Sequence, residues 1–333
     1  MLGIFCDEKI VSELRGKTIV ITGATGLIGK NLIRCLLEGN DECDLNIKIV
    51  AVIRNEKDAR IMFGKRIQYI KCDFLQDKLI VDNDVDYIIH CASITESAKF
   101  VENPVETINT TICGINSVME LAREKSPKSV VYLSSMEVYG EKISGKISED
   151  NLGYLDLLSP RSSYSESKRM AENICTAYKN EYDVPVKIAR LAQTIGPGIK
   201  YDDKRVIVEF ARCAIEGRDI VLSTQGLSEH MYIYVEDAVE AILTILIKGE
   251  VGKAYNVAND DTYCSIFQMA HMIREEIMEN KIDVIVNENS VDSKKYAPEH
   301  HLYLDITELR KLGWEPRTSL KDSYINLINS LQG

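Results

Sequence analysis

The sequence has 333 residues, of which 45% are hydrophobic, so it is long enough for one large domain or two lobes with a substantial core. Its formal net charge of -11 and its isoelectric point near 5.1 argue against general nucleic-acid binding, because no basic surplus is present to neutralise phosphates. Nine cysteines without a CxxC pair, no secretory signal and no stretch of about 18 apolar residues predict a cytoplasmic protein with reduced thiols and no membrane contact.

The stretch KTIVITGATGLIGK at residues 17–30 predicts a strand, a glycine turn and a helix. Residues 18–21 suit a buried parallel strand, and apolar residues recur at helical spacing from 27 to 37. Glycines allow a tight turn and close approach of a ligand, and the unpaired N–H groups of a helix start favour a phosphate. We therefore expect a dinucleotide here, although the GxxGxxG spacing also fits a plain strand-to-helix connection. The residues expected to contact the cofactor are Gly23, Thr25, Gly26, Leu27, Ile28 and Gly29.

The residue after the second predicted strand, at 47–53, bears on the choice of cofactor. An acidic residue there would bind the adenosine ribose hydroxyl, whereas Arg54 can accommodate a 2′-phosphate or stack on adenine. Arg54 therefore favours NADP over NAD, although a solvated arginine at a strand end is also compatible with the pattern.

Two further strands are expected to end at the cofactor cleft. A strand at 67–70 leads to Asp73 and Phe74, and Asp73 could accept a hydrogen bond from the adenine amino group or cap the following turn. A strand at 85–90 ends in His90, which we expect to be structural. The small residues that follow it permit close approach of a ligand and are Cys91, Ala92 and Ser93.

A serine-rich strand end and a helix supply the candidate catalytic groups. A fifth strand at 130–133 opens onto Ser135, at the end of a parallel strand where such sheets bind ligands. A helix over 164–178 places Tyr164 and Lys168 on one face. The ammonium is expected to lower the pKa of the phenol, and the serine hydroxyl could polarise a substrate oxygen. A chance pair on a helix is the alternative, which the preceding glycine turn disfavours.

In combination and order, these motifs resemble the extended short-chain dehydrogenase/reductase family, the NAD-dependent epimerases and dehydratases of sugar nucleotides. The resemblance covers nearly the whole chain and rests on TGATGLIG, SSMEVYG, YSESK and YIYVEDAV, with Arg190 and Gly196-Pro197. It implies an α/β fold with a doubly wound parallel sheet, the Rossmann fold. Residues 1–193 would form the NAD(P)-binding domain and 194–333 a smaller substrate lobe, with strands near 230–257 returning to the first domain.

The resemblance also implies roles for individual residues. Tyr164 would take a proton from a sugar hydroxyl, Lys168 would hold the cofactor ribose, and Ser135 would bind the reacting oxygen, giving a 4-keto-sugar. Glu137 lies where 4,6-dehydratases and UDP-glucuronate decarboxylases have a glutamate, which can remove the C5 proton or orient a sugar carboxylate. A carboxylate paired for structure alone is the alternative.

Several positions depart from the family pattern. Met136 stands where dehydratases usually have an aspartate, and His230 stands where decarboxylases are expected to have an arginine. Gln193 replaces the usual asparagine, so we expect a remodelled sugar pocket that includes all three residues. Arg205 could reach a nucleotide phosphate or form a surface ion pair. The candidates for a further diphosphate contact are Lys295, His300 and His301.

The sequence thus favours a nucleotide-sugar lyase, a decarboxylase or a 4,6-dehydratase, ahead of a 4-epimerase. An NADP-dependent 4-keto-sugar reductase or dehydrogenase is a further alternative, and a non-catalytic dinucleotide sensor is disfavoured by the intact Ser135, Tyr164 and Lys168. The family also implies a homodimer through the helices at 104–123 and 164–178, and a setting in surface polysaccharide or glycan precursor synthesis. The sequence contains no metal-ligand constellation.

Overall fold

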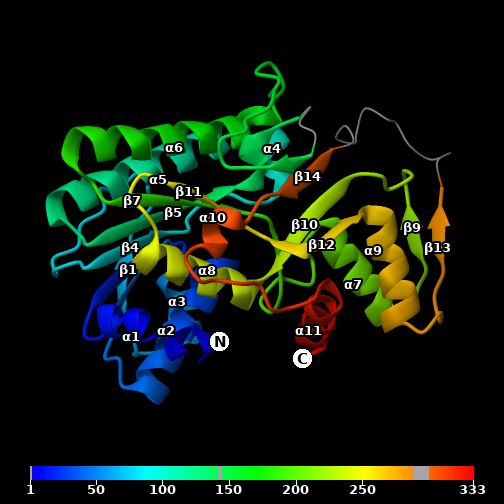
Figure 1. Ribbon diagram of the computed structural model, residues 1–333, viewed down its shortest axis with the longest axis horizontal. Helices are drawn as coiled ribbons and strands as arrows, with labels where there is room; N and C mark the ends of the chain where they lie inside the picture. The colour runs from blue at the N-terminus through cyan, green and yellow to red at the C-terminus, as the bar shows by residue number, and fades with distance from the viewer. Residues whose placement is uncertain (1, 142–144, 288–299) are drawn as a thin grey trace.

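Seven parallel strands form the central sheet of the molecule, in the order β11-β7-β5-β4-β1-β2-β3 (Figure 1). The computed structural model describes residues 2–141, 145–287 and 300–333, so Lys295 lies outside the described residues. The chain builds outward from β1 to one edge and then, from β4, to the other, which confirms the predicted doubly wound sheet. The strands are β1 (Thr18–Thr22), β2 (Lys48–Ile53), β3 (Gln68–Lys71), β4 (Tyr87–His90), β5 (Ser129–Ser135), β7 (Val186–Leu191) and β11 (Ala254–Val257).

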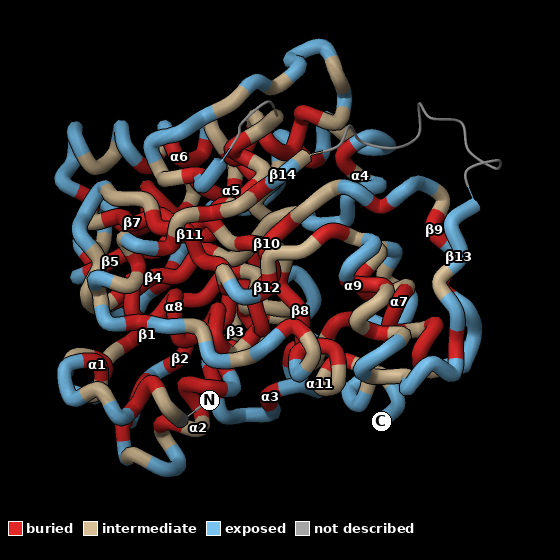
Figure 2. Tube along the Cα trace, turned by 45° about the vertical axis from the view of Figure 1, so that its right-hand side comes forward, coloured by how far each residue is buried: buried red, intermediate tan, exposed pale blue. Residues whose placement is uncertain are grey.

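Helices cover both faces of this sheet, which is why its strands are apolar on both sides. Ile19 and Ile21 of β1 pack into one core with the first group of helices, whereas Val20 between them packs into a second core with the other group. Figure 2 shows the central strands as a largely buried layer. The first group comprises α1 (Glu8–Leu14), α2 (Leu27–Cys43) and α8 (Val235–Lys248), and the second α5 (Pro104–Lys125) and α6 (Ser162–Tyr182). The short elements beside this sheet are η1 (Leu2–Cys6), α3 (Glu56–Phe63), α4 (Ser97–Glu102), η2 (Met136–Tyr139) and α10 (Thr307–Arg310).

The C-terminal half, together with β6, forms a second, mixed sheet in the order β12-β10-β14-β6, with β8 also paired to β10. Its strands are β6 (Lys146–Ile147), β8 (Gln193–Ile195), β10 (Glu229–Tyr234), β12 (Asn259–Ser265) and β14 (His301–Leu304). A third hydrophobic core lies beneath it. The elements around this core are α7 (Val206–Glu216), α9 (Ile266–Met272), η3 (Ile273–Ile277), α11 (Leu320–Gln332) and the paired strands β9 (Ile220–Leu222) and β13 (Val284–Val286).

The expected return of residues 230–257 to the central sheet occurs in part. Helix α8 and strand β11 do return, and the predicted inward face of α8 is buried at Ala238, Ile242, Ile245 and Leu246. Strand β10 does not return, because β8, β12 and β14 satisfy its hydrogen bonds within the second sheet.

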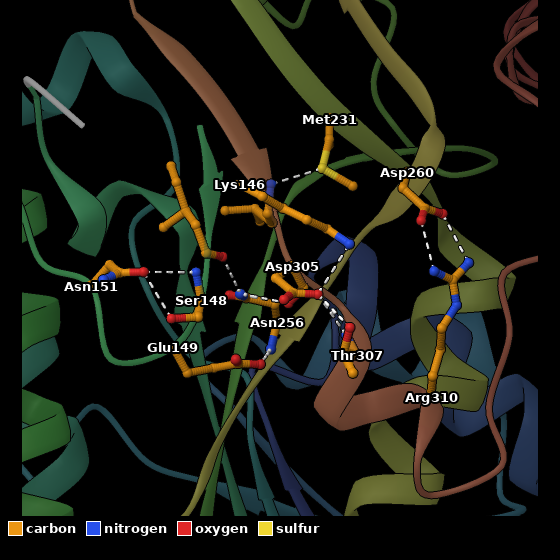
Figure 3. A network of polar contacts seen from close by, with 12 residues as sticks. Lys146, Ser148, Glu149, Asn151, Met231, Asn256, Asp260, Asp305, Thr307 and Arg310 are labelled. Atoms are coloured by element: carbon orange, nitrogen blue, oxygen red, sulfur yellow. Dashed lines mark hydrogen bonds and ion pairs between the residues drawn. The ribbon is translucent and has the colours of Figure 1, made fainter. Parts of the chain in front are cut away.

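Polar contacts join the two sheets. Asn256 on β11 donates through its Nδ2 to the backbone oxygens of Ile147 at 3.1 Å and Asp305 at 2.9 Å, and its backbone N–H donates to Glu149 at 2.8 Å (Figure 3). These bonds fix β6 and the segment after β14 beside the sheet edge. Among the residues described, no helix combines the length and the apolar character needed to cross a membrane.

Candidate active site

The glycine turn between β1 and α2 packs directly on the end of β4. Gly23 has a φ of +64°, and a Cβ there would lie 2.7 Å from the backbone nitrogen of Ala92. A Cβ on Gly29 would lie 2.3 Å from the backbone oxygen of Gly23. Both distances are too short for a real contact, so neither position admits a side chain. The turn is therefore held close to the sheet by backbone packing.

The start of α2 has the properties of an anion site. Its N-cap is Gly26, which is exposed and makes no side-chain capping bond, so the first N–H groups of the helix are not capped by that residue. Thr25, Leu27 and Ile28 beside it are partly exposed. This cradle fits the pyrophosphate of a nicotinamide dinucleotide.

The other expected cofactor contacts lie at the same edge of the sheet. Arg54 is exposed at the end of β2, and Asp73 accepts a hydrogen bond from the N–H of Leu75 at 3.1 Å, which is a turn-capping contact. Cys91, Ala92 and Ser93 are partly exposed after β4, as is Phe74 after β3.

His90 is a structural residue, as expected. It is buried, and its Nδ1 shares a 2.7 Å hydrogen bond with the hydroxyl of Thr22. Burial lowers the pKa of His90 to about 3, so the ring is neutral at physiological pH. Its ring lies edge-on to that of Phe74, with centroids 5.8 Å apart.

Tyr164 and Lys168 lie buried on α6 against the end of β5. The Lys168 Nζ donates to the backbone oxygen of Leu133 at 2.7 Å and lies 5.7 Å from the centroid of the Tyr164 ring. Burial lowers the pKa of Lys168 to about 8, and the nearby Glu172 opposes that change. An ammonium has three donors, so two remain for a ligand beside the Leu133 contact.

The pKa of Tyr164 differs from the sequence-based expectation. It is raised rather than lowered, chiefly because burial disfavours the phenolate and secondarily because of the Glu137 charge, while a hydrogen bond with Ser135 opposes the rise. Four-residue spacing predicted the Lys168 neighbour correctly but carried no information about desolvation. In the protein without ligands Tyr164 is therefore a neutral phenol.

Glu137 lies on η2, two residues after Ser135, and its carboxylate contacts Ser165 of α6 and Arg161, the residue before that helix. The guanidinium of Arg161 donates to Oε1 at 2.9 Å, and the hydroxyl of Ser165 donates to Oε2 at 3.2 Å. The backbone N–H of Glu137 donates to the Ser135 hydroxyl at 3.2 Å. The carboxylate is thus an ion-paired neighbour of the candidate catalytic tyrosine.

Sequence reasoning missed Arg161, which lies three residues before Tyr164. Its guanidinium lies 4.9 Å from the centroid of the Phe100 ring, and that ring stacks on Tyr164 at 4.2 Å with an interplanar angle of 4°. Residues three apart around a helix start lie on one side of it, and this spacing is the signal that could have identified Arg161.

Ser135 and Met136 lie at the end of β5, and the other expected substrate residues belong to the second sheet or to the start of α7. Gln193 on β8 and His230 on β10 occupy neighbouring strands. Burial and, to a smaller extent, the neighbouring His300 and His301 lower the pKa of His230 to about 4. Within the described ranges, the Nδ1 atom of His230 has no hydrogen-bond partner. His230 is therefore neutral at physiological pH.

Arg205 and Met136 complete the expected substrate set. Arg205 precedes α7 and is paired with Asp203 through its Nε, 3.1 Å from each carboxylate oxygen, and its Nη2, at 2.8 Å. This contact is the surface ion pair, one of the two alternatives that the sequence allowed for Arg205. Met136, beside Ser135, is buried.

A separate cavity of about 600 Å³ lies next to the polar contacts of Figure 3. Arg190 in its wall is fully engaged, donating to both carboxylate oxygens of Glu172 at 3.0 and 2.7 Å and to the backbone oxygen of Glu149 at 2.6 Å. Neither Tyr164 nor Lys168 lines this cavity. Its lining comes mainly from α6, α10 and the edge strands β7 and β11.

The sheet order, a glycine turn that admits no side chain and the Ser135–Tyr164–Lys168 set define the class of dinucleotide-dependent enzymes with a short-chain dehydrogenase fold. A model of the NAD dependent epimerase/dehydratase family matches residues 19–258, and the chain belongs to this family.

Known proteins resemble this chain in sequence or in fold. UDP-glucuronic acid decarboxylase 1 of Xenopus tropicalis is 28% identical over 96% of this chain and 73% of that protein. The UDP-glucuronic acid 4-epimerase of Bacillus cereus, solved with UDP-glucuronic acid and NAD, has a TM-score of 0.78 at 20% identity, covering 95% of this chain and 99% of that one. The dTDP-glucose 4,6-dehydratase of Bacillus anthracis, solved with NAD, has a TM-score of 0.76 at 21% identity, covering 95% and 96%.

Replacing Gly23 with alanine tests the cradle. The new Cβ would push the turn off Ala92, so we expect the dissociation constant for NAD, measured by calorimetry, to rise by roughly tenfold or more, the cost of a lost charged hydrogen bond. The matched control is Gly64→Ala, because Gly64 has a similar φ of +62° but no neighbour within 4 Å. That variant should lose about 1 kcal/mol of stability and keep its NAD affinity. Equal affinities in the two variants would refute the assignment.

Proposed function

We propose that this protein removes carbon dioxide from a nucleotide-linked uronic acid, such as UDP-glucuronate, through a 4-keto intermediate. The observation that carries the proposal is the position of the Glu137 carboxylate, which accepts hydrogen bonds from Arg161 and Ser165, the residues that flank Tyr164 at the start of α6. Alignments with UDP-glucuronic acid decarboxylases from two vertebrates and a plant cover 91–96% of this chain, which supports the choice of substrate.

The residues of the central sheet suit the oxidation that starts this reaction. A nicotinamide dinucleotide held at the glycine turn would supply reversible hydride transfer at C4 of the sugar. Tyr164 would accept the proton of the C4 hydroxyl, and Ser135 would hold the same oxygen. Lys168 would hold the cofactor ribose with the donors that Leu133 leaves open, and its charge would stabilise the phenolate.

The 4-keto group makes loss of carbon dioxide accessible. The bond between C5 and C6 breaks, its electron pair stays on C5 in conjugation with the C4 carbonyl, and a proton then adds at C5. Glu137 is the residue that we assign to this proton transfer and to the orientation of the sugar. The alternative, 4,6-dehydration, needs an acid for the leaving hydroxyl, which Met136 cannot supply.

The lobes divide the two ligands between them in this proposal. Residues 1–193 would bind the dinucleotide and bring the reacting groups, Met136 and Gln193 to the sugar, and residues 194–333 would form the rest of the nucleotide-sugar site. Gln193 and His230 lie on adjacent strands that suit neutral hydrogen-bonding contacts to substrate. Arg205 would have to exchange Asp203 for a phosphate to serve as a nucleotide contact.

Glu137→Gln tests the lyase assignment. Incubated with UDP-glucuronate, UDP-glucose, dTDP-glucose and GDP-mannose without added cofactor, the wild-type protein should yield the product that lacks carbon dioxide, detected by mass spectrometry. The variant should lose this activity by roughly 100-fold or more, because the amide cannot transfer a proton, and keep its NAD affinity.

The matched control is Glu166→Gln, which removes a carboxylate of similar exposure, 34% against 28%, from α6. Full turnover by Glu137→Gln would contradict the role of the carboxylate. A product of unchanged mass would indicate a 4-epimerase, and turnover that consumes added NADP or NADPH would indicate a reductase or dehydrogenase.

Arg54 supports binding of NADP as well as NAD. It is exposed at the end of β2, where the adenosine ribose of a dinucleotide lies in this fold, and no ion pair engages it in the described part of the chain. Arg54→Gln should raise the dissociation constant for NADP by roughly tenfold, the cost of one charged hydrogen bond, and leave that for NAD nearly unchanged. Equal effects on both cofactors, measured by calorimetry, would rule out recognition of a 2′-phosphate.

A homodimer through α5 and α6 agrees with the surface of these helices. Val105 and Ile108 on α5 and Met170 on α6 are exposed by 68%, 41% and 53%, on two helices that pack side by side. We expect a mass of twice 37.6 kDa by light scattering, and a shift to the monomer on Val105→Glu. A monomeric wild-type protein would refute this interface.

The cellular setting that we propose is the cytoplasm, because all nine cysteines are free thiols. The products of such a reaction would serve surface polysaccharide or glycan synthesis.

A further inference from the structure

The first turn of α2 carries a lysine whose charge is not balanced on its own helix. Lys30 lies four residues after the N-cap Gly26, and therefore on the same side of the helix as that residue of the anion cradle. Side chains on a helix point back toward its N-terminus, which is the positive end of the helix dipole. The first turn contains no acidic residue, so the ammonium is held where its own helix repels it.

The surroundings of Lys30 are positive as well. Arg34 follows one turn later on α2, and Lys200 approaches from the segment between β8 and α7. Burial and then these two charges lower the pKa of Lys30, and no carboxylate pairs with it in the part of the chain that the structure describes. A partly buried cation among other cations is unfavourable until an anion joins it.

The Lys30 ammonium joins α2 to a segment that lies far along the chain. It donates to the backbone oxygen of Gly198, and the side-chain amide of Asn31 donates to the backbone oxygen of Pro197 at 3.3 Å. Gly198 has a φ of +99°, and a Cβ there would lie 2.2 Å from the Cε of Lys30. Only a glycine therefore leaves room for the lysine at this point. An ammonium has three donors, so two remain for a ligand beside the Gly198 contact.

We propose that Lys30 binds the diphosphate of a bound nucleotide, while its contact with Gly198 holds the segment between β8 and α7 beside the same group. A diphosphate is carried by two molecules of the proposed reaction, the dinucleotide and the nucleotide-sugar. The inference therefore rests on the proposed function for its ligands. The position of Lys30 on the helix of the glycine turn favours the dinucleotide.

Calorimetry with NAD and with UDP on the full-length protein tests this inference. Lys30→Met keeps an unbranched apolar side chain but removes the charge. We expect the dissociation constant for the ligand that Lys30 contacts to rise roughly 10- to 100-fold, the effect of a lost charged hydrogen bond. That constant should also rise less steeply with salt concentration than in the wild-type protein. Lys30→Arg should restore most of the affinity, because it keeps the charge.

The matched control is Arg34→Met, which removes the same charge from an exposed position on the next turn of α2 and should leave both dissociation constants close to their wild-type values. A rise for either ligand in Lys30→Met supports the inference and identifies the molecule that carries the diphosphate. Unchanged constants for both ligands, or equal rises in Lys30→Met and Arg34→Met, would overturn it. If Lys30→Met does not fold, Lys30→Gln, which keeps a donor for Gly198 without the charge, decides by the same criteria.

The test separates this inference from the proposed function, because binding is measured without turnover. Weakened binding in Lys30→Met, in a protein whose wild-type form never releases carbon dioxide, would support the diphosphate contact and refute the decarboxylase assignment. Release of carbon dioxide by the wild-type protein, with both dissociation constants unchanged in Lys30→Met, would overturn the role of Lys30 and leave the decarboxylase assignment standing.

Discussion

The common direction of the seven central strands determines where the whole site lies. In a parallel sheet all carboxyl ends meet at one edge, so the segments after β1, β4 and β5 converge although they are distant in sequence. Gly23 after β1 touches the backbone of Ala92 after β4, and Ser135 at the end of β5 hydrogen-bonds with Tyr164 from α6. The phosphate cradle and the reacting groups therefore depend on one register, and a strand displaced by a single residue would separate them.

Burial then sets the charges within that frame. Lys168 keeps its charge at neutral pH because its lowered pKa is still about 8, whereas His230, with a pKa of about 4, is neutral. Positive charge beside the candidate catalytic tyrosine comes from the buried Lys168 and from the half-exposed Arg161, which is paired with Glu137. Since the pKa of Tyr164 is raised in the protein alone, bound ligands must lower it before the phenol can act as a base.

The features predictable from the sequence are those with a local cause. The glycine turn, the Tyr164 and Lys168 pair and the buried face of α8 follow from spacing along one strand or helix. The position of β10 in the second sheet did not follow, because its partners lie far along the chain. The raised pKa of Tyr164 and the contact of Arg161 with Glu137 likewise depend on burial and tertiary packing. The roles of Gln193, His230 and Arg205 in substrate binding stay predictions.

The central claim is that hydride leaves C4 of the sugar and returns to the same carbon while carbon dioxide is lost. Deuterium placed at C4 of UDP-glucuronate tests it directly, with the product analysed by mass spectrometry and NMR in the absence of added cofactor. We predict that the pentose product retains the deuterium at C4. A product that carries hydrogen at C4, or no product until NADP or NADPH is supplied in stoichiometric amounts, would contradict the claim.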